Sequence, residues 1–94
     1  MSLYDMIIRR SFEVRNRLGM HARAAAKLVE TAAGFRSSVS LEYGGQEVDG
    51  KSLLDILTLG CPYGGRIEAR IEGPDADKAA LALERLFADK FGED

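Results

Sequence analysis

Apolar and polar residues alternate in four short stretches of the chain, which is the pattern of half-buried β-strands. In the first stretch, from Ile7 to Val14, one face is apolar except for Arg10. The glycine pair Gly44-Gly45 predicts a hairpin turn between the second and third stretches, because both central positions of a type I′ turn need positive φ. The predicted strands cover, in order, residues 7–14, 39–43, 46–49 and 67–71.

Two longer stretches carry apolar residues at helical spacing. The first runs from His21 to Ala33, is rich in alanine, and ends before Gly34, where a helix C-cap glycine is expected. The second begins after Gly73-Pro74-Asp75 and keeps its apolar stripe to about Phe91. Both have one apolar face, so each is predicted to cover a sheet.

A third predicted helix is short. It begins at Ser52, whose hydroxyl together with the Asp55 carboxylate predicts a capping box. The run Gly60-Cys61-Pro62 ends the helix after about two turns, because glycine and proline interrupt helical structure.

This short helix is apolar on almost every side, and one sheet face cannot cover all of it. We expect Leu53 and Ile56 to lie in the core. Leu54 and Leu57 are three residues apart, so they are predicted to form an outward patch that a partner protein could contact.

The element order is therefore β-α-β-β-α-β-α. Four short strands with three helices cannot cover both faces of a sheet, so we expect an α+β fold in which an antiparallel sheet carries its helices on one face. A chain of 94 residues is expected to form one domain.

Composition narrows the function classes. The net charge is −2 and the pI is near 5.4, and the sequence shows no basic stripe that could neutralise nucleic-acid phosphates. We therefore do not expect a nucleic-acid-binding protein. The single cysteine, Cys61, excludes an internal disulfide and a multi-thiolate zinc site. No apolar run approaches the ~20 residues of a membrane span, and no secretory leader opens the chain. We expect a cytoplasmic protein without membrane insertion.

Residues 45–52, Gly-Gln-Glu-Val-Asp-Gly-Lys-Ser, match the phosphate-loop pattern GxxxxGK[ST] in full. Glu47 and Asp49 would place carboxylates where polyphosphate should bind, and Val48 alternates as a strand residue does. The chain is also too short for the parallel sheet and the magnesium-binding strand of such enzymes. We favour the strand interpretation and keep a small nucleotide-binding protein as an alternative.

The only histidine, His21, stands at the start of the alanine-rich helix. A lone histidine is often just a polar cap or a partly buried ring. Here the unpaired amides of the helix start and the nearby Arg23 favour an anion. The same positive field disfavours an imidazolium, so we expect a neutral ring able to attack a phosphoryl group. No second histidine supports a metal site, and no serine elbow supports a triad.

Two stretches resemble the signatures of the histidine-containing phosphocarrier (HPr) family of the bacterial sugar phosphotransferase system. Residues 18–29, Leu-Gly-Met-His-Ala-Arg-Ala-Ala-Ala-Lys-Leu-Val, are similar to its active-site signature. Residues 50–57, Gly-Lys-Ser-Leu-Leu-Asp-Ile-Leu, are similar to the region around its regulatory serine. The resemblance covers residues 10–94, which we expect to form the HPr-like domain. Residues 1–9 are then either a flexible extension or the first part of the first strand.

The resemblance implies an open-faced β-sandwich, a four-stranded antiparallel sheet with three helices on one face. It implies that His21 accepts phosphate on Nδ1 from phosphorylated enzyme I and passes it to a histidine of an enzyme IIA, with Arg23 as the second active-site residue. Ala22 and Arg23 would bind the phosphate. Such a protein is a phosphoryl carrier, not an independent enzyme, and we expect a monomer that needs no cofactor and no metal.

The resemblance also implies regulation and docking. Ser52 matches the serine that an HPr kinase/phosphorylase modifies in some bacteria. The implied partner-docking residues are Met20, Leu53, Leu54 and Leu57. A regulatory HPr-like module that acts through phosphorylated Ser52 and protein contacts stays open as the alternative function.

Two positions depart from the family pattern. Ala24 replaces a common proline, with little expected cost because alanine is a good helix former. Asp55 stands where glycine is frequent and adds a negative charge beside Ser52, which bears on partner choice and on kinase recognition. The sequence leaves open whether the phosphate serves sugar transport, a nitrogen-related branch or regulation alone.

Overall fold

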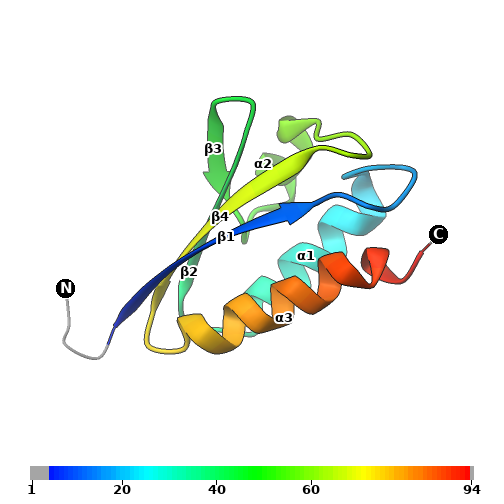
Figure 1. Cartoon of the computed structure of the whole chain (residues 1–94). Coiled ribbons are helices and arrows are strands. Elements are labelled where there is room, and N and C mark those ends of the chain that lie inside the picture. Colours follow the sequence, from blue (N-terminus) through cyan, green and yellow to red (C-terminus); the bar gives the residue numbers. More distant parts are fainter. Residues whose placement is uncertain (1–4, 94) are drawn as a thin grey trace.

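The computed structural model describes residues 5–93, which form a four-stranded antiparallel sheet with its helices on one face (Figure 1). The predicted order β-α-β-β-α-β-α is confirmed, with one 3₁₀ turn added at the end. The elements are β1 (Met6–Glu13), α1 (Ala22–Ala33), β2 (Ser38–Tyr43), β3 (Gln46–Asp49), α2 (Leu53–Leu59), β4 (Arg66–Gly73), α3 (Ala76–Ala88) and η1 (Lys90–Gly92).

The strands lie in the order β1-β4-β2-β3, so β4 occupies the interior between β1 and β2. Each neighbouring pair is antiparallel, and Ile71 of β4 faces Ile8 of β1 and Val39 of β2. Residues directly opposite each other share a face of the sheet. This register therefore places a row of aliphatic side chains on the face that the helices cover.

Strand β1 begins at Met6, which pairs with Gly73. Residues 6–9 thus lie in the strand and extend it along β4. Residues 1–4, which belong to the possible flexible extension, lie outside the described residues.

Three phenylalanines connect the sheet to the last helix and to the segment after it. The rings of Phe12 in β1 and Phe87 in α3 stack with centroids 4.7 Å apart. Phe87 in turn meets the ring of Phe91 edge to face at 4.9 Å. All three side chains are buried, so this cluster fixes the path of the chain beyond α3. Truncating such a ring to alanine typically costs about 3–5 kcal/mol of stability.

The caps of α1 and α2 differ in part from the prediction. Gly34 is the C-cap of α1, but its φ of −73° is right-handed, so this backbone conformation does not require glycine. Ser52 Oγ accepts a hydrogen bond from the Asp55 N–H at 3.3 Å, as predicted. The reciprocal half of the capping box is wrong: the Asp55 carboxylate accepts from the Asp49 N–H at 3.4 Å. The Ser52 N–H is already bonded to the Asp49 carbonyl at 3.1 Å.

The segment that matches the phosphate-loop pattern is not a loop. Gly44 and Gly45 form the predicted hairpin turn with φ of 61° and 83°. Residues 46–49 then form β3, where Val48 pairs with Leu41 of β2 and is buried. Backbone groups that take part in the sheet are not free to surround a phosphate. The nucleotide-binding alternative therefore has no support in this segment.

Candidate functional site

His21 is the N-cap residue of α1. Its backbone is extended, and its side chain makes no capping hydrogen bond. Its carbonyl accepts the first helical hydrogen bond, from the Ala25 N–H at 2.9 Å. The N–H groups of Ala22 and Arg23 precede that bond, so they face outward at the positive end of the helix. This end of α1 is suited to binding an anion next to the imidazole.

The loop before His21 is fixed by a close approach of two backbones. Gly19 has a φ of 69°, and a Cβ there would lie 3.0 Å from the Cys61 carbonyl oxygen and 3.1 Å from the Tyr63 nitrogen. The Met20 N–H donates to the same Cys61 carbonyl at 2.9 Å. Only glycine fits this position without a shift of the backbone. The segment before β4 therefore holds the start of α1 in place.

The His21 ring faces a carboxylate from the far end of the sequence. Nε2 lies 2.8 Å from Glu93 Oε1, and the two side chains are 28% and 16% exposed. Hydrogen bonds from Asn16, then from His21, lower the pKa of Glu93; burial acts in the opposite direction, and the nearby charge of Arg23 lowers the pKa further. Glu93 is therefore ionised at neutral pH and can only accept hydrogen bonds. Nε2 must carry the hydrogen, and in the neutral ring Nδ1 keeps the free lone pair.

An unusual backbone path delivers Glu93 to this position. Lys90 and Phe91 have φ of 55° and 56°, and Gly92 has 74°. The Phe91 ring is fully buried, and its carbonyl accepts a hydrogen bond from Lys27 Nζ of α1 at 2.6 Å. Non-glycine residues occupy this region only where surrounding contacts hold them. Figure 1 shows the segment that follows α3 beside the loop that leads into α1.

A shallow pocket surrounds the imidazole. Its positive groups are Arg17 and Arg23, both exposed, and neither forms a salt bridge within residues 5–93. Among the described residues, Glu93 is the one carboxylate of this pocket. The pocket is lined by Arg17, Leu18, His21, Ala22, Arg23 and Glu93.

The sequence identified His21, Ala22 and Arg23 as site residues but missed three members of this pocket, Arg17, Leu18 and Glu93. Arg17 is a basic residue four positions before the histidine, and that spacing was the only available signal for it. Glu93 gave no signal of its own. Its contact with His21 spans 72 residues and depends on the path after α3.

The predicted docking residues fall into two groups. Met20 is only 5% exposed and belongs to the core, so its side chain is not available to a partner. Leu53, Leu54 and Leu57 of α2 are exposed, and we call them the leucine patch. The expectation that Leu53 lies in the core is wrong, whereas Ile56 is fully buried as expected. Leu18 and Tyr63 add further exposed apolar surface near the start of α1.

Ser52 lies at the N-terminus of α2 and not in the histidine pocket. Ser52 is partly exposed. The side chain of its neighbour Lys51 points away from it, because Lys51 Nζ donates a hydrogen bond to the Phe35 carbonyl at 2.8 Å. Asp55 is the acidic residue of the first turn. A phosphate on Ser52 would therefore meet the positive helix end and the Asp55 carboxylate together.

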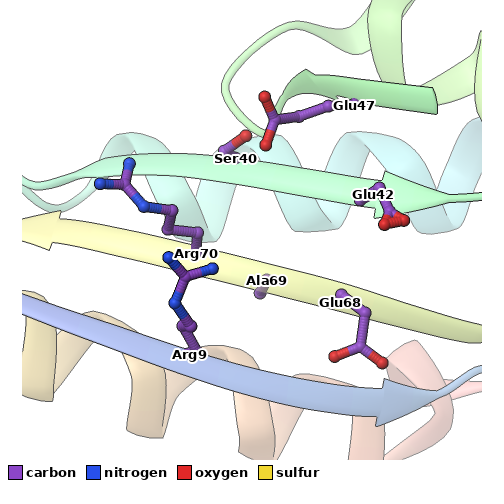
Figure 2. A pocket seen from close by; sticks show the side chains of 7 residues that line it. All are labelled: Arg9, Ser40, Glu42, Glu47, Glu68, Ala69 and Arg70. Atoms are coloured by element: carbon purple, nitrogen blue, oxygen red, sulfur yellow. The ribbon is translucent and has the colours of Figure 1, made fainter. Parts of the chain in front are cut away.

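A second hollow lies on the open face of the sheet (Figure 2). Arg9 and Arg70 lie toward one end of it, and Glu42 and Glu68 toward the other. Its lining contains neither a histidine nor a cysteine. Mixed charges on an uncovered sheet face are ordinary solvated surface, so we do not assign this hollow a role in the chemistry.

Other kinds of site find no support in the described part of the chain. Residues 5–93 contain no group of three His, Cys, Asp or Glu side chains that could hold a metal ion. No helix within the same residues is long and apolar enough to cross a membrane. Burial raises the pKa of the Cys61 thiol to about 11, so this cysteine is not a nucleophile at neutral pH.

Comparison with known proteins adds the family. Residues 8–89 match the family model PTS-HPr, described as the PTS HPr component phosphorylation site. The chain is 44% identical over 81 residues to the phosphocarrier protein HPr of Xylella fastidiosa, covering 86% of this chain and 91% of that protein. It is 38% identical to the phosphocarrier protein NPr of Escherichia coli K12, covering 95% and 100%.

The fold agrees with solved structures of this kind. The crystal structure of HPr-C-His from Thermoanaerobacter tengcongensis superposes with a TM-score of 0.89 at 37% identity. The superposition covers 93% of this chain and 98% of that one. The chain therefore belongs to the HPr family of phosphocarrier proteins.

Proposed function

We propose that this protein carries a phosphoryl group on Nδ1 of His21, accepting it from phosphorylated enzyme I and donating it to a histidine of an enzyme IIA. The main observation in support is the His21–Glu93 contact of 2.8 Å, which occupies Nε2 and leaves Nδ1 with the lone pair. Family membership supports phosphotransfer as the activity.

The pocket supplies what phosphoryl transfer needs. The Nδ1 lone pair attacks phosphorus, the new P–N bond forms, and the bond to the donor's leaving group breaks. Charge on the equatorial oxygens is stabilised by the outward N–H groups of Ala22 and Arg23 and by the guanidinium of Arg23. Arg17 lines the same pocket and adds a second guanidinium. None of these steps requires a cofactor.

A carrier must also release its phosphate. The His21 side chain is 28% exposed and lies in a shallow pocket. The phosphate would therefore be held without being enclosed, and each partner would complete the site when it docks. We propose the leucine patch as the main apolar docking surface, since three exposed leucines on two turns are more than isolated surface residues.

Phosphorylation of Ser52 is proposed as a regulatory modification. Its hydroxyl caps α2 directly beside the leucine patch, so a phosphate there would add negative charge to the docking surface. The second candidate function is a regulatory module that works through phosphorylated Ser52 alone. The occupied Nε2 and the two guanidiniums that line the pocket favour the carrier, because a regulator needs neither.

Incubation with enzyme I and labelled phosphoenolpyruvate tests the proposal. The carrier assignment predicts an acid-labile label on the wild type and none on His21→Ala, which should remain folded because the side chain is at the surface. A regulator without carrier activity would remain unlabelled as the wild type. Equilibrium binding of ATP with magnesium to the same preparation tests the nucleotide-binding alternative.

A further inference from the structure

Asn16 is a fully buried polar residue next to the histidine pocket. Its Nδ2 donates two hydrogen bonds, one to the Gly19 carbonyl at 2.7 Å and one to Glu93 Oε1 at 2.8 Å. One side chain thereby connects the loop before α1 to the carboxylate that faces His21.

The neighbours fix the orientation of this amide. Turning it over would place Oδ1 against a carbonyl oxygen and a carboxylate oxygen, which are both acceptors. In the orientation present, Oδ1 is buried and has no hydrogen-bond partner within the described residues. A buried acceptor without a partner destabilises the fold. What Asn16 contributes is therefore the pair of hydrogen bonds from Nδ2, made although the unpartnered Oδ1 lowers stability.

The same carboxylate oxygen serves both residues. Glu93 Oε1 accepts from Asn16 Nδ2 and from His21 Nε2, each at 2.8 Å. Asn16 cannot change its position freely, because it is enclosed and also bonded to Gly19. It consequently restrains the carboxylate, and the carboxylate restrains the ring.

We propose that Asn16 is a positioning residue for His21. Its amide holds Glu93 against Nε2, which keeps the hydrogen on Nε2, limits rotation of the ring and directs the Nδ1 lone pair into the pocket. The benefit for phosphoryl transfer rests on the function proposed above, whereas the effect on the ring does not. Oriented carboxylate–imidazole pairs are a general means of fixing a histidine tautomer.

The ring nitrogens can be observed directly, because the protein has one histidine. In protein labelled with ¹⁵N-histidine at alkaline pH, we expect the wild type to show Nε2 with hydrogen and Nδ1 without. In Asn16→Leu, both resonances should move toward the averaged values of a flexible peptide. Transfer from phosphorylated enzyme I should slow by about tenfold. Unchanged resonances in that variant would overturn the proposal.

A double-mutant cycle separates positioning from a purely structural role. Glu93→Ala should shift the resonances in the same way, and Asn16→Leu combined with Glu93→Ala should lose no more transfer rate than the larger single change. Rate losses that multiply in the double variant would show that Asn16 acts independently of Glu93, contrary to the proposal.

Two further variants keep the test decisive. Asn16→Asp preserves the shape of the side chain and replaces Asn16→Leu if that variant does not fold. It should shift the His21 ring resonances, because the new carboxylate repels Glu93. Ser37→Ala is the matched control, since Ser37 is the other buried polar residue within residues 5–93 and lies beyond the opposite end of α1. It should lower stability and leave the ring resonances unchanged. If the wild type accepts no phosphate, the proposed function is wrong. The His21 ring resonances would still show whether Asn16 positions the ring.

Discussion

Lys27 Nζ donates a hydrogen bond to the Phe91 carbonyl at 2.6 Å, and this contact joins the middle of α1 to the segment that carries Glu93. The segment contains two non-glycine residues with positive φ, Lys90 and Phe91. Such residues cost free energy that tertiary contacts must offset. The Lys27 contact and the buried Phe91 ring are those contacts, so the geometry at His21 depends on residues outside its pocket.

Lys27→Met is expected to lower the free energy of unfolding by about 1–3 kcal/mol, because it removes a charged donor and keeps most of the apolar stem. It should also move the His21 ring resonances toward those of Glu93→Ala. Urea unfolding followed by circular dichroism measures the first effect. Lys78→Met, an exposed lysine of α3, is the control and should change stability by less than about 0.5 kcal/mol. Equal effects of the two substitutions would contradict the anchoring role.

Arg23→Ala is expected to slow phosphoryl transfer several-fold or more without unfolding the protein, because the side chain is exposed and lies in the pocket. Arg17→Ala should slow it less, since Arg17 lies in the preceding loop and not at the helix end. Rapid-quench measurement of transfer from phosphorylated enzyme I gives both rates. An unchanged rate in Arg23→Ala would remove that residue from the site.

How much of the fold and of the site could be predicted from the sequence depends on how far apart in the chain the interacting residues lie. Strand alternation, the Gly44-Gly45 turn and the helix stripes are local patterns, and each appears in the structure close to its predicted position. The histidine at a helix start was equally local. A local pattern can also mislead. Residues 45–52 match the phosphate-loop pattern, yet residues 46–49 are a strand that pairs with β2.

The parts that the sequence did not predict depend on contacts between distant segments. Glu93 reaches His21 only because Lys90 and Phe91 adopt left-handed backbone conformations, which nothing in their residue types indicates. Leu53 is exposed because the packing of a two-turn helix, apolar on both sides, is decided by its neighbours. Met20 is buried in the loop before α1, where its N–H is bonded to the distant Cys61 carbonyl. Asn16 was equally invisible, because its role lies in a bond to a residue 77 positions away.

Ser52→Ala should cost about 1 kcal/mol, because it removes the hydroxyl that caps α2. Ser52→Asp keeps a side chain able to cap and should retain most of this stability. It should nevertheless weaken docking of enzyme I, since it adds charge beside the leucine patch. Titration calorimetry with enzyme I distinguishes the two variants. Stronger loss of docking in Ser52→Ala than in Ser52→Asp would argue against regulation through charge.

The lowered pKa of Asp75 predicts that the free energy of unfolding decreases at low pH. Hydrogen bonds from the Ser37 hydroxyl and from the Arg36 and Ser37 N–H groups lower its pKa from 3.8 to about 2. The unfolded chain therefore takes up the proton first, and the contribution of Asp75 is complete above about pH 4 and lost as the pH falls toward 2.

Urea midpoints between pH 5 and pH 2 measure this loss. Asp75→Asn should be less stable than the wild type at neutral pH, and the difference should shrink on acidification. Asp77→Asn, which changes an exposed carboxylate in the first turn of α3, should run parallel to the wild type. A difference for Asp75→Asn that stays constant with pH would contradict the sign worked out here.

The central claim concerns one atom, Nδ1 of His21. The most direct measurement is to phosphorylate ¹⁵N-histidine-labelled protein with enzyme I and phosphoenolpyruvate, and to identify the phosphorylated nitrogen by NMR at alkaline pH. The account predicts phosphorus bonded to Nδ1, with the hydrogen still on Nε2 facing Glu93. Phosphate on Nε2, on Ser52 or on no residue at all would contradict it.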